Sequence, residues 1–254
     1  VTGILTEVGG KTSHSAILAR ALEIPAVLSI PGITEEISNG DNVVLDGSEG
    51  QVYVNPDEGL QAEYEQKRAA YLEEKAALAQ FIGKETVTAD GVKVELCANI
   101  GKPEDALKVV ECDGEGIGLF RTEFLFMDRP QIPTEEEQFA AYRKVAETLE
   151  GKPVIIRTLD VGGDKEIPYL ALEKEENPFL GFRAIRLCLK REDLYRPQLK
   201  ALLRASAYGD IRIMIPMVTC LDELRAVKDM VAEIKEELKA EGVAYNEDIK
   251  VGIM

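Results

Sequence analysis

The chain has 254 residues, of which 45% are hydrophobic and 30% charged, and its formal net charge is −16. This composition is that of an ordinary globular protein, long enough for one large hydrophobic core or two modest ones. The negative charge makes nucleic acid and anionic membranes poor partners and would attract a basic protein, although a role in solubility explains it equally well. No apolar stretch approaches the ~20 residues that cross a bilayer.

Four cysteines lie far apart in the sequence and lack the spacing of metal ligands. They are Cys97, Cys112, Cys188 and Cys220. We expect them to be reduced, buried thiols of a cytoplasmic protein, since the chain shows no secretory signal. The chain opens inside an apolar segment and ends within an expected strand, so we also expect it to be a fragment of a longer protein.

The single histidine, His14, follows a glycine pair and precedes an amphipathic segment, so a helix is expected over 14–23. Free backbone N–H groups in the first turn of a helix stabilise an anionic group such as a phosphoryl group. A structural histidine is the alternative for any lone histidine. Thr12 and Ser13 are candidate helix caps, and together with the glycine pair they favour a phosphoryl carrier.

The next segments predict short strands followed by a long helix. A strand is expected at 26–30 and a β-hairpin at 42–55, where two apolar runs flank a loop bounded by glycines. Residues 57–82 are polar, contain no helix breaker and carry only a thin apolar stripe, which is typical of a helix that connects domains. Such a helix would be roughly 39 Å long at ~1.5 Å per residue.

From residue 92 onward, short apolar strands alternate with helices, which predicts parallel strands covered on both faces. Strands are expected at 92–100, 116–120, 153–159, 211–218 and 250–254. Helices are expected at 103–111, 134–150, 193–208 and 221–241. Thr134 and Glu137 match a capping box. An open doubly wound sheet and a (β/α) barrel both fit this order, and charged residues directly after strands favour the barrel.

Two arginines, Arg121 and Arg157, close apolar strands. An arginine is costly to desolvate at such a position unless it holds an anion, and its planar guanidinium matches phosphate or carboxylate oxygens. Two of them on separate strands predict a converging anion clamp. For either arginine alone, a salt bridge with one of the 46 acidic residues is an equal alternative. Glu123 is placed to orient Arg121.

Two further cations are candidates for the same site. Lys165 follows a glycine pair, with a solvated loop lysine as the alternative, and Arg183 belongs to the string NPFLGFRAIR, whose Arg186 is expected on a helix surface. The carboxylates of residues 92–254 form no convincing metal triad. With one histidine in the chain, hydrolase triads are excluded.

Four segments, in order, resemble the enzyme I family of the phosphoenolpyruvate:sugar phosphotransferase system. They are GGKTSHSAILARALEIPAV, GIGLFRTEFLFMDR, IIRTLDVGGDK and NPFLGFRAIR, and the resemblance runs through essentially all 254 residues. The histidine segment alone is shared with pyruvate phosphate dikinase and phosphoenolpyruvate synthase. The form of the second segment and the short spacing between the motifs favour enzyme I.

The resemblance implies an α/β chain of three parts. Residues 1–55 would be the C-terminal part of a small swivelling phosphohistidine domain, 56–83 a linker helix, and 84–254 the first part of a phosphoenolpyruvate-binding (β/α)8 TIM-type barrel, incomplete here. The implied partners are phosphoenolpyruvate and the histidine-containing phosphocarrier protein, in the first step of sugar phosphotransfer.

The resemblance also implies roles for single residues. His14 would be phosphorylated on Nε2, Arg121 and Arg157 would hold the substrate phosphate, and Arg183 and Lys165 would lie near it. The family's magnesium ligands, a further phosphate-binding arginine and a catalytic cysteine lie beyond the segment that ends at Met254.

These departures imply that Mg²⁺ serves the intact enzyme, that this chain holds no metal ligand, and that the chain alone is inert toward phosphoenolpyruvate. The intact enzyme is expected to be a homodimer. Two alternatives stay open, a relative of the dikinase and synthase enzymes and a regulatory phosphoacceptor module without its own catalysis.

Overall fold

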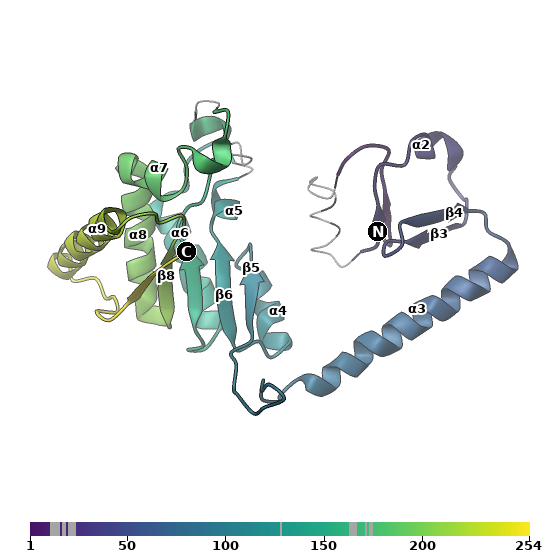
Figure 1. Ribbon diagram of the computed structural model, residues 1–254, viewed down its shortest axis with the longest axis horizontal. Coiled ribbons are helices and arrows are strands. Elements are labelled where there is room, and N and C mark those ends of the chain that lie inside the picture. The colour runs from purple at the N-terminus through teal and green to yellow at the C-terminus, as the bar shows by residue number, and fades with distance from the viewer. Residues whose placement is uncertain are drawn as a thin grey trace. The chain divides into compact units, whose positions relative to one another are not determined.

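The computed structural model describes residues 1–10, 16, 19, 24–127, 129–162, 167–170, 172 and 175–254. Most of the helix expected over 14–23 lies outside the described residues, as do two predicted site residues, His14 and Lys165. The chain divides into two compact units, Val1–Phe81 and Ile82–Met254, which are drawn in Figure 1.

The first unit contains two small sheets. β1 (Ile4–Leu5) pairs in parallel with β2 (Ala26–Val27), and α2 (Ile33–Glu36) follows. β3 (Val43–Asp46) and β4 (Gln51–Val54) form an antiparallel hairpin, which confirms the hairpin expected at 42–55.

The strand expected at 26–30 is shorter than predicted. Only residues 26–27 pair, because Ser29 has a left-handed φ of 61° that ends the extended backbone.

The long polar helix expected at 57–82 is present as α3 (Glu58–Leu78), and none of its residues is buried. It begins at Asp57, whose carboxylate accepts a hydrogen bond from the N–H of Leu60 at 2.8 Å. Its second turn is attached to the hairpin, because the hydroxyl of Tyr64 donates to Oε1 of Gln51 at 2.6 Å. A 3₁₀ turn, η1 (Ala79–Phe81), follows the helix.

The second unit is built on a five-stranded sheet in which all strands are parallel and each pairs with the next strand in the sequence. In order, the strands are β5 (Cys97–Ile100), β6 (Gly116–Arg121), β7 (Val154–Arg157), β8 (Ile211–Ile215) and β9 (Lys250–Ile253). All five lie where strands were expected, and a parallel sheet is therefore confirmed.

Residues 92–96, expected to begin the first of these strands, lie outside the sheet. Val94 donates its N–H to the carbonyl of Thr86 at 2.9 Å, and Val87 and Lys93 form an isolated antiparallel bridge. The apolar alternation of this segment fits a strand, but Leu96 is 63% exposed, so the segment packs against no core in the part of the chain that the structure describes.

Helices connect the strands. The long ones are α6 (Glu135–Thr148), α8 (Glu192–Ala205) and α9 (Leu221–Ala240). The short ones are α4 (Asp105–Glu111), α5 (Glu123–Phe126), α7 (Ile185–Lys190), η2 (Pro168–Leu170), η3 (Pro178–Leu180) and η4 (Ser206–Tyr208). The capping box at Thr134 and Glu137 is confirmed. Among the described helices, none is long and apolar enough to cross a membrane.

The sheet is buried on one face. Along β8, Ile211, Ile213 and Ile215 are at most 1% exposed, whereas Arg212 and Met214 between them are partly exposed. The buried face lies toward α8, which contacts β8 and packs on α6. The other face carries a shallow hollow of about 180 Å³ over β7, β8 and β9. The expectation that both faces are covered is therefore wrong for the part of the chain that the structure describes.

The cysteines differ in burial. Cys188 is buried and Cys97 half-buried, whereas Cys112 and Cys220 are exposed. The expectation of four buried thiols is wrong for these two, because they cap the end of α4 and the start of α9, where helices reach the surface.

Candidate functional site

The two arginines that end strands are neighbours in the sheet. Arg121 is the last residue of β6 and Arg157 the last of β7, and the parallel register pairs them directly. Paired residues on neighbouring strands point to the same face, about 4.8 Å apart. The residues before them, Phe120 and Ile156, are fully buried in the core on the opposite face. The two arginines therefore share one face at the C-terminal edge of the sheet.

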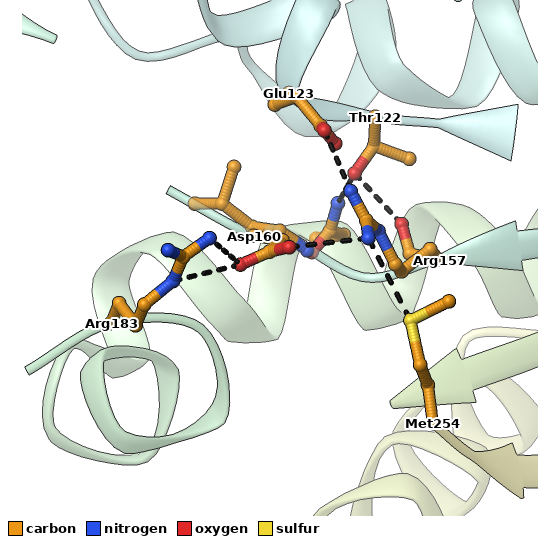
Figure 2. Close-up of polar contacts among 8 residues, drawn as sticks. Thr122, Glu123, Arg157, Asp160, Arg183 and Met254 are labelled. Atoms are coloured by element: carbon orange, nitrogen blue, oxygen red, sulfur yellow. Dashed lines mark hydrogen bonds and ion pairs between the residues drawn. The ribbon is translucent and has the colours of Figure 1, made fainter. Parts of the chain in front are cut away.

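Arg157 is held by two carboxylates, as Figure 2 shows. Its Nη2 donates to Oε1 of Glu123 at 2.7 Å, and its Nη1 lies 3.2 Å from Oδ2 of Asp160. Nη1 also lies 3.7 Å from Sδ of Met254. Glu123, which was expected to orient Arg121, thus forms an ion pair with Arg157.

Asp160 is shared between two arginines. Its Oδ1 accepts hydrogen bonds from Nη2 and Nε of Arg183, at 2.8 and 3.2 Å, while its Oδ2 faces Arg157. Figure 2 shows the carboxylate between the two guanidinium groups. The structure therefore brings Arg183 to the strand-end arginines, as the sequence predicted, but through a carboxylate that the sequence analysis did not single out.

Burial strengthens the attraction between these charged side chains. The side chains of Arg157, Glu123, Asp160 and Arg183 are 10%, 1%, 9% and 8% exposed. Charges removed from water to this degree attract far more than surface pairs do, and each needs a counter-charge to repay its desolvation. The internal ion pair, one of the two alternatives for Arg157, is therefore present, and the anion clamp stays a prediction.

The described part of the site has more positive than negative charge. Three guanidinium groups, on Arg121, Arg157 and Arg183, face two carboxylates, on Glu123 and Asp160. Arg121 makes no ion pair with any residue in the described ranges. Nε of Arg157 is buried without a hydrogen-bond partner among the described residues, although buried donors are normally paired. An anion would supply both the missing charge and the missing acceptor.

The loop after β7 depends on a glycine. Gly162 has a φ of +115°, and a Cβ there would lie 2.6 Å from the Cβ of Arg183. Only glycine fits this close approach. The neighbouring backbone is joined by a hydrogen bond from Ala184 N–H to the carbonyl of Val161, at 3.3 Å. The glycine therefore lets the loop that carries Asp160 run against the segment that carries Arg183.

Sequence reasoning missed Asp160 and the pairing of Glu123 with Arg157. The i,i+3 spacing of Arg157 and Asp160 was a weak signal, since such pairs are informative on helices and this segment is a loop. His14 and Lys165, the other two predicted site residues, lie outside the described residues.

The described residues do not fit a metal ion. They hold no group of three or more His, Cys, Asp or Glu side chains that could bind one. The two buried carboxylates of the site, Glu123 and Asp160, already pair with arginines.

Comparisons with known proteins agree on one family. The profile described as PEP-utilising enzyme, PEP-binding domain, matches residues 75–254, and that described as PEP-utilising enzyme, mobile domain, matches residues 1–50. Proteins named phosphoenolpyruvate-protein phosphotransferase match over all 254 residues: those of Geobacillus stearothermophilus, Staphylococcus carnosus and Bacillus subtilis are 57%, 54% and 53% identical.

The chain spans less than half of these relatives, 44% to 45% of their length. A solution structure of enzyme I is 50% identical in sequence, and the match covers 28% of each chain. Its TM-score of 0.27 is too low to compare the folds. The PEP-binding profile alone covers well over half of the residues. This chain therefore belongs to the PEP-utilising enzymes.

Proposed function

We propose that the chain is part of a phosphoenolpyruvate-protein phosphotransferase, and that its strand-end arginines bind the phosphate of phosphoenolpyruvate. The observation that carries the proposal is the surplus of positive charge at this sheet edge: the buried arginines Arg157 and Arg183 are balanced by two buried carboxylates, and the half-buried Arg121 beside them makes no ion pair in the described ranges. Guanidinium groups match phosphate oxygens in charge and geometry. The name shared by relatives at 53–57% identity supports this over a dikinase or synthase.

In the proposed reaction, Arg121 and Arg157 hold the phosphoryl group, and Arg183 offsets the negative charge of the neighbouring Asp160. The bond between phosphorus and the enol oxygen breaks, and a bond forms between phosphorus and Nε2 of a neutral His14. The enolate that leaves takes up a proton at carbon and becomes pyruvate. Phosphoryl transfer depends mostly on positioning and on neutralised charge, which is what the arginines supply. His14 then passes the group to the histidine-containing phosphocarrier protein.

We propose the same three parts for the chain as the resemblance implied. Residues 1–55 would be the C-terminal part of a phosphohistidine domain, 56–83 a linker helix and 84–254 the first part of a (β/α)8 barrel. The strand order supports the barrel, because each strand pairs with the next without the reversal of a doubly wound sheet. The partly exposed second face of the sheet would then line the barrel interior.

Three further features of the intact protein stay predictions. Mg²⁺ would be held outside the described residues, the intact enzyme would be a homodimer, and it would work in the cytoplasm.

The test is phosphorylation of His14. The chain is incubated with phosphoenolpyruvate and Mg²⁺, with and without a separately produced piece of the Geobacillus relative that this chain does not span. Acid-labile phosphate on the peptide that contains His14 is measured by mass spectrometry, with His14→Gln as the control. Phosphate is expected only with the added piece. Labelling without it would show that the catalytic residues have been misplaced, and no labelling under either condition would refute the proposal.

A further inference from the structure

One buried glutamine connects the two loops that carry the site. Gln198, on α8, is 0% exposed. Its Oε1 accepts a hydrogen bond from the N–H of Leu159 at 2.9 Å, and its Nε2 donates to Oγ1 of Thr122 and to the hydroxyl of Tyr142, both at 3.2 Å. All of its hydrogen-bonding groups thus have partners from other elements.

These contacts lie directly behind the charged residues. Thr122 stands between Arg121 and Glu123, and Leu159 lies just before Asp160. The register between β6 and β7 ends at the pair of Arg121 and Arg157. Beyond that pair, Oγ1 of Thr122 donates to the carbonyl of Arg157 at 2.8 Å, and Gln198 joins both loops to α8.

The hydrogen bonds continue away from the site in one consistent direction. The hydroxyl of Tyr142 donates to Oε1 of Gln138 at 3.2 Å, and Nε2 of Gln138 donates to the carbonyl of Pro133 at 3.1 Å. Burial raises the pKa of Tyr142 above its ordinary value, so the hydroxyl keeps the proton that it donates. A buried network in which every donor has an acceptor favours a single arrangement of its members.

Packing alone does not explain a glutamine here. Gln198 lies four residues from both Leu194 and Leu202, which are fully buried on the same face of α8. An apolar side chain of similar length would fill this position without the cost of burying an amide. The amide therefore serves the geometry of the loops that it joins.

We propose that Gln198 is a positioning residue that sets the spacing of Arg121 and Arg157 for anion binding. It does so by fixing Thr122 and Leu159, the residues next to the charged groups. The binding part of this inference rests on the proposed function, whereas the positioning part concerns only how firmly the two loops are held.

The experiment compares two matched variants of the chain. Gln198→Met removes the amide that joins the loops. Gln138→Met makes the same change at a glutamine that is 1% exposed and belongs to the same network, but whose side-chain hydrogen bonds in the described chain go to Pro133 and Tyr142 and to neither loop. Three quantities are measured: the free energy of unfolding in urea, the hydrogen exchange of the Leu159 amide and the Arg157 Nε–H by NMR, and the dissociation constant for inorganic phosphate.

Both variants should lose stability. Only Gln198→Met should speed exchange at Leu159 and Arg157 and weaken phosphate binding, by on the order of tenfold, since small displacements of binding groups have large effects. Thr122→Val, with Thr122→Ser as its conservative partner, tests the same link if Gln198→Met does not fold: the valine variant should behave like Gln198→Met, and the serine variant like the wild type.

Equal effects of the two methionine variants, or unchanged exchange in both Gln198→Met and Thr122→Val, would overturn the positioning role. A wild-type chain that does not bind phosphate would count against the proposed function, and the exchange rates would still decide the role of Gln198.

Discussion

Removing the charge of Asp160 should strongly destabilise the second unit. In Asp160→Asn, Arg157 keeps Glu123 as a counter-charge, but Arg183 loses the one carboxylate that the described residues offer it. The side chains stay 8–10% exposed, so water compensates little. Leaving a buried charge without its partner is the most destabilising way to alter an ion pair.

The size of the loss follows from the geometry. Unit charges ~4 Å apart attract by about 4 kcal/mol at an effective dielectric constant of about 20, so two guanidinium groups give Asp160 a gross attraction of about 8 kcal/mol. Desolvation of the carboxylate offsets several kcal/mol of this. The asparagine oxygen also keeps one hydrogen bond. We expect a net loss of about 3 kcal/mol in the free energy of unfolding.

The assay is urea denaturation of the wild type and Asp160→Asn, with and without inorganic phosphate. Asp193→Asn is the matched control, because Asp193 also binds an arginine in a bidentate way but is 56% exposed, and its loss should cost less than about 1 kcal/mol. Phosphate should stabilise Asp160→Asn more than the wild type, since it restores a negative charge. Similar losses in the two variants would refute the reasoning about buried charge.

Three further changes have defined outcomes. Hydrogen bonds from the Thr134 backbone and from Arg129 lower the pKa of Glu137 from its ordinary value of 4.5 to about 2. Glu137→Gln should therefore cost about 1 kcal/mol at pH 7, and this difference should vanish as pH falls from about 4.5 to 2. Gly162→Ala should destabilise by more than about 1 kcal/mol, because alanine is strained at φ +115° and collides with Arg183. Leu202→Ala should cost about 2–5 kcal/mol by opening a cavity in a fully buried position.

Thermal or urea unfolding measures all three. A difference for Glu137→Gln that persists unchanged at pH 2 would contradict the assigned pKa. For Gly162→Ala, wild-type stability would show that the loop can move away from Arg183. For Leu202→Ala, Leu221→Ala is the control, because Leu221 is 66% exposed, and equal losses would contradict the position of the core.

The strands and the strand-end arginines were predictable because apolar runs and the charges that follow them are local signals. The long polar helix was also predictable as a connecting helix, because its apolar stripe is too thin to pack into a core. Asp160 was not predictable in its shared role, because that role depends on a loop folded back by Gly162 against Arg183. The segment at 92–96 was assigned to a strand because its apolar residues do alternate, although no surface among the described residues buries them.

Gln198 could have been found. It interrupts an apolar helical face at i+4 from Leu194, and a polar residue at such a position marks either a solvated gap or a buried contact. Choosing between these requires knowing what faces the helix, and that information is not local.

Because Asp160 is shared by Arg157 and Arg183, a change at one arginine alters the ion pair of the other. An anion that draws the guanidinium of Arg157 toward itself would leave Asp160 to Arg183 alone and tighten that contact. The segment that carries Arg183, including the exposed side chains of Phe179 and Leu180, would then be held more firmly when the neighbouring arginine is occupied. Through this one carboxylate, anion binding at Arg157 would change how firmly an exposed segment of the protein is held.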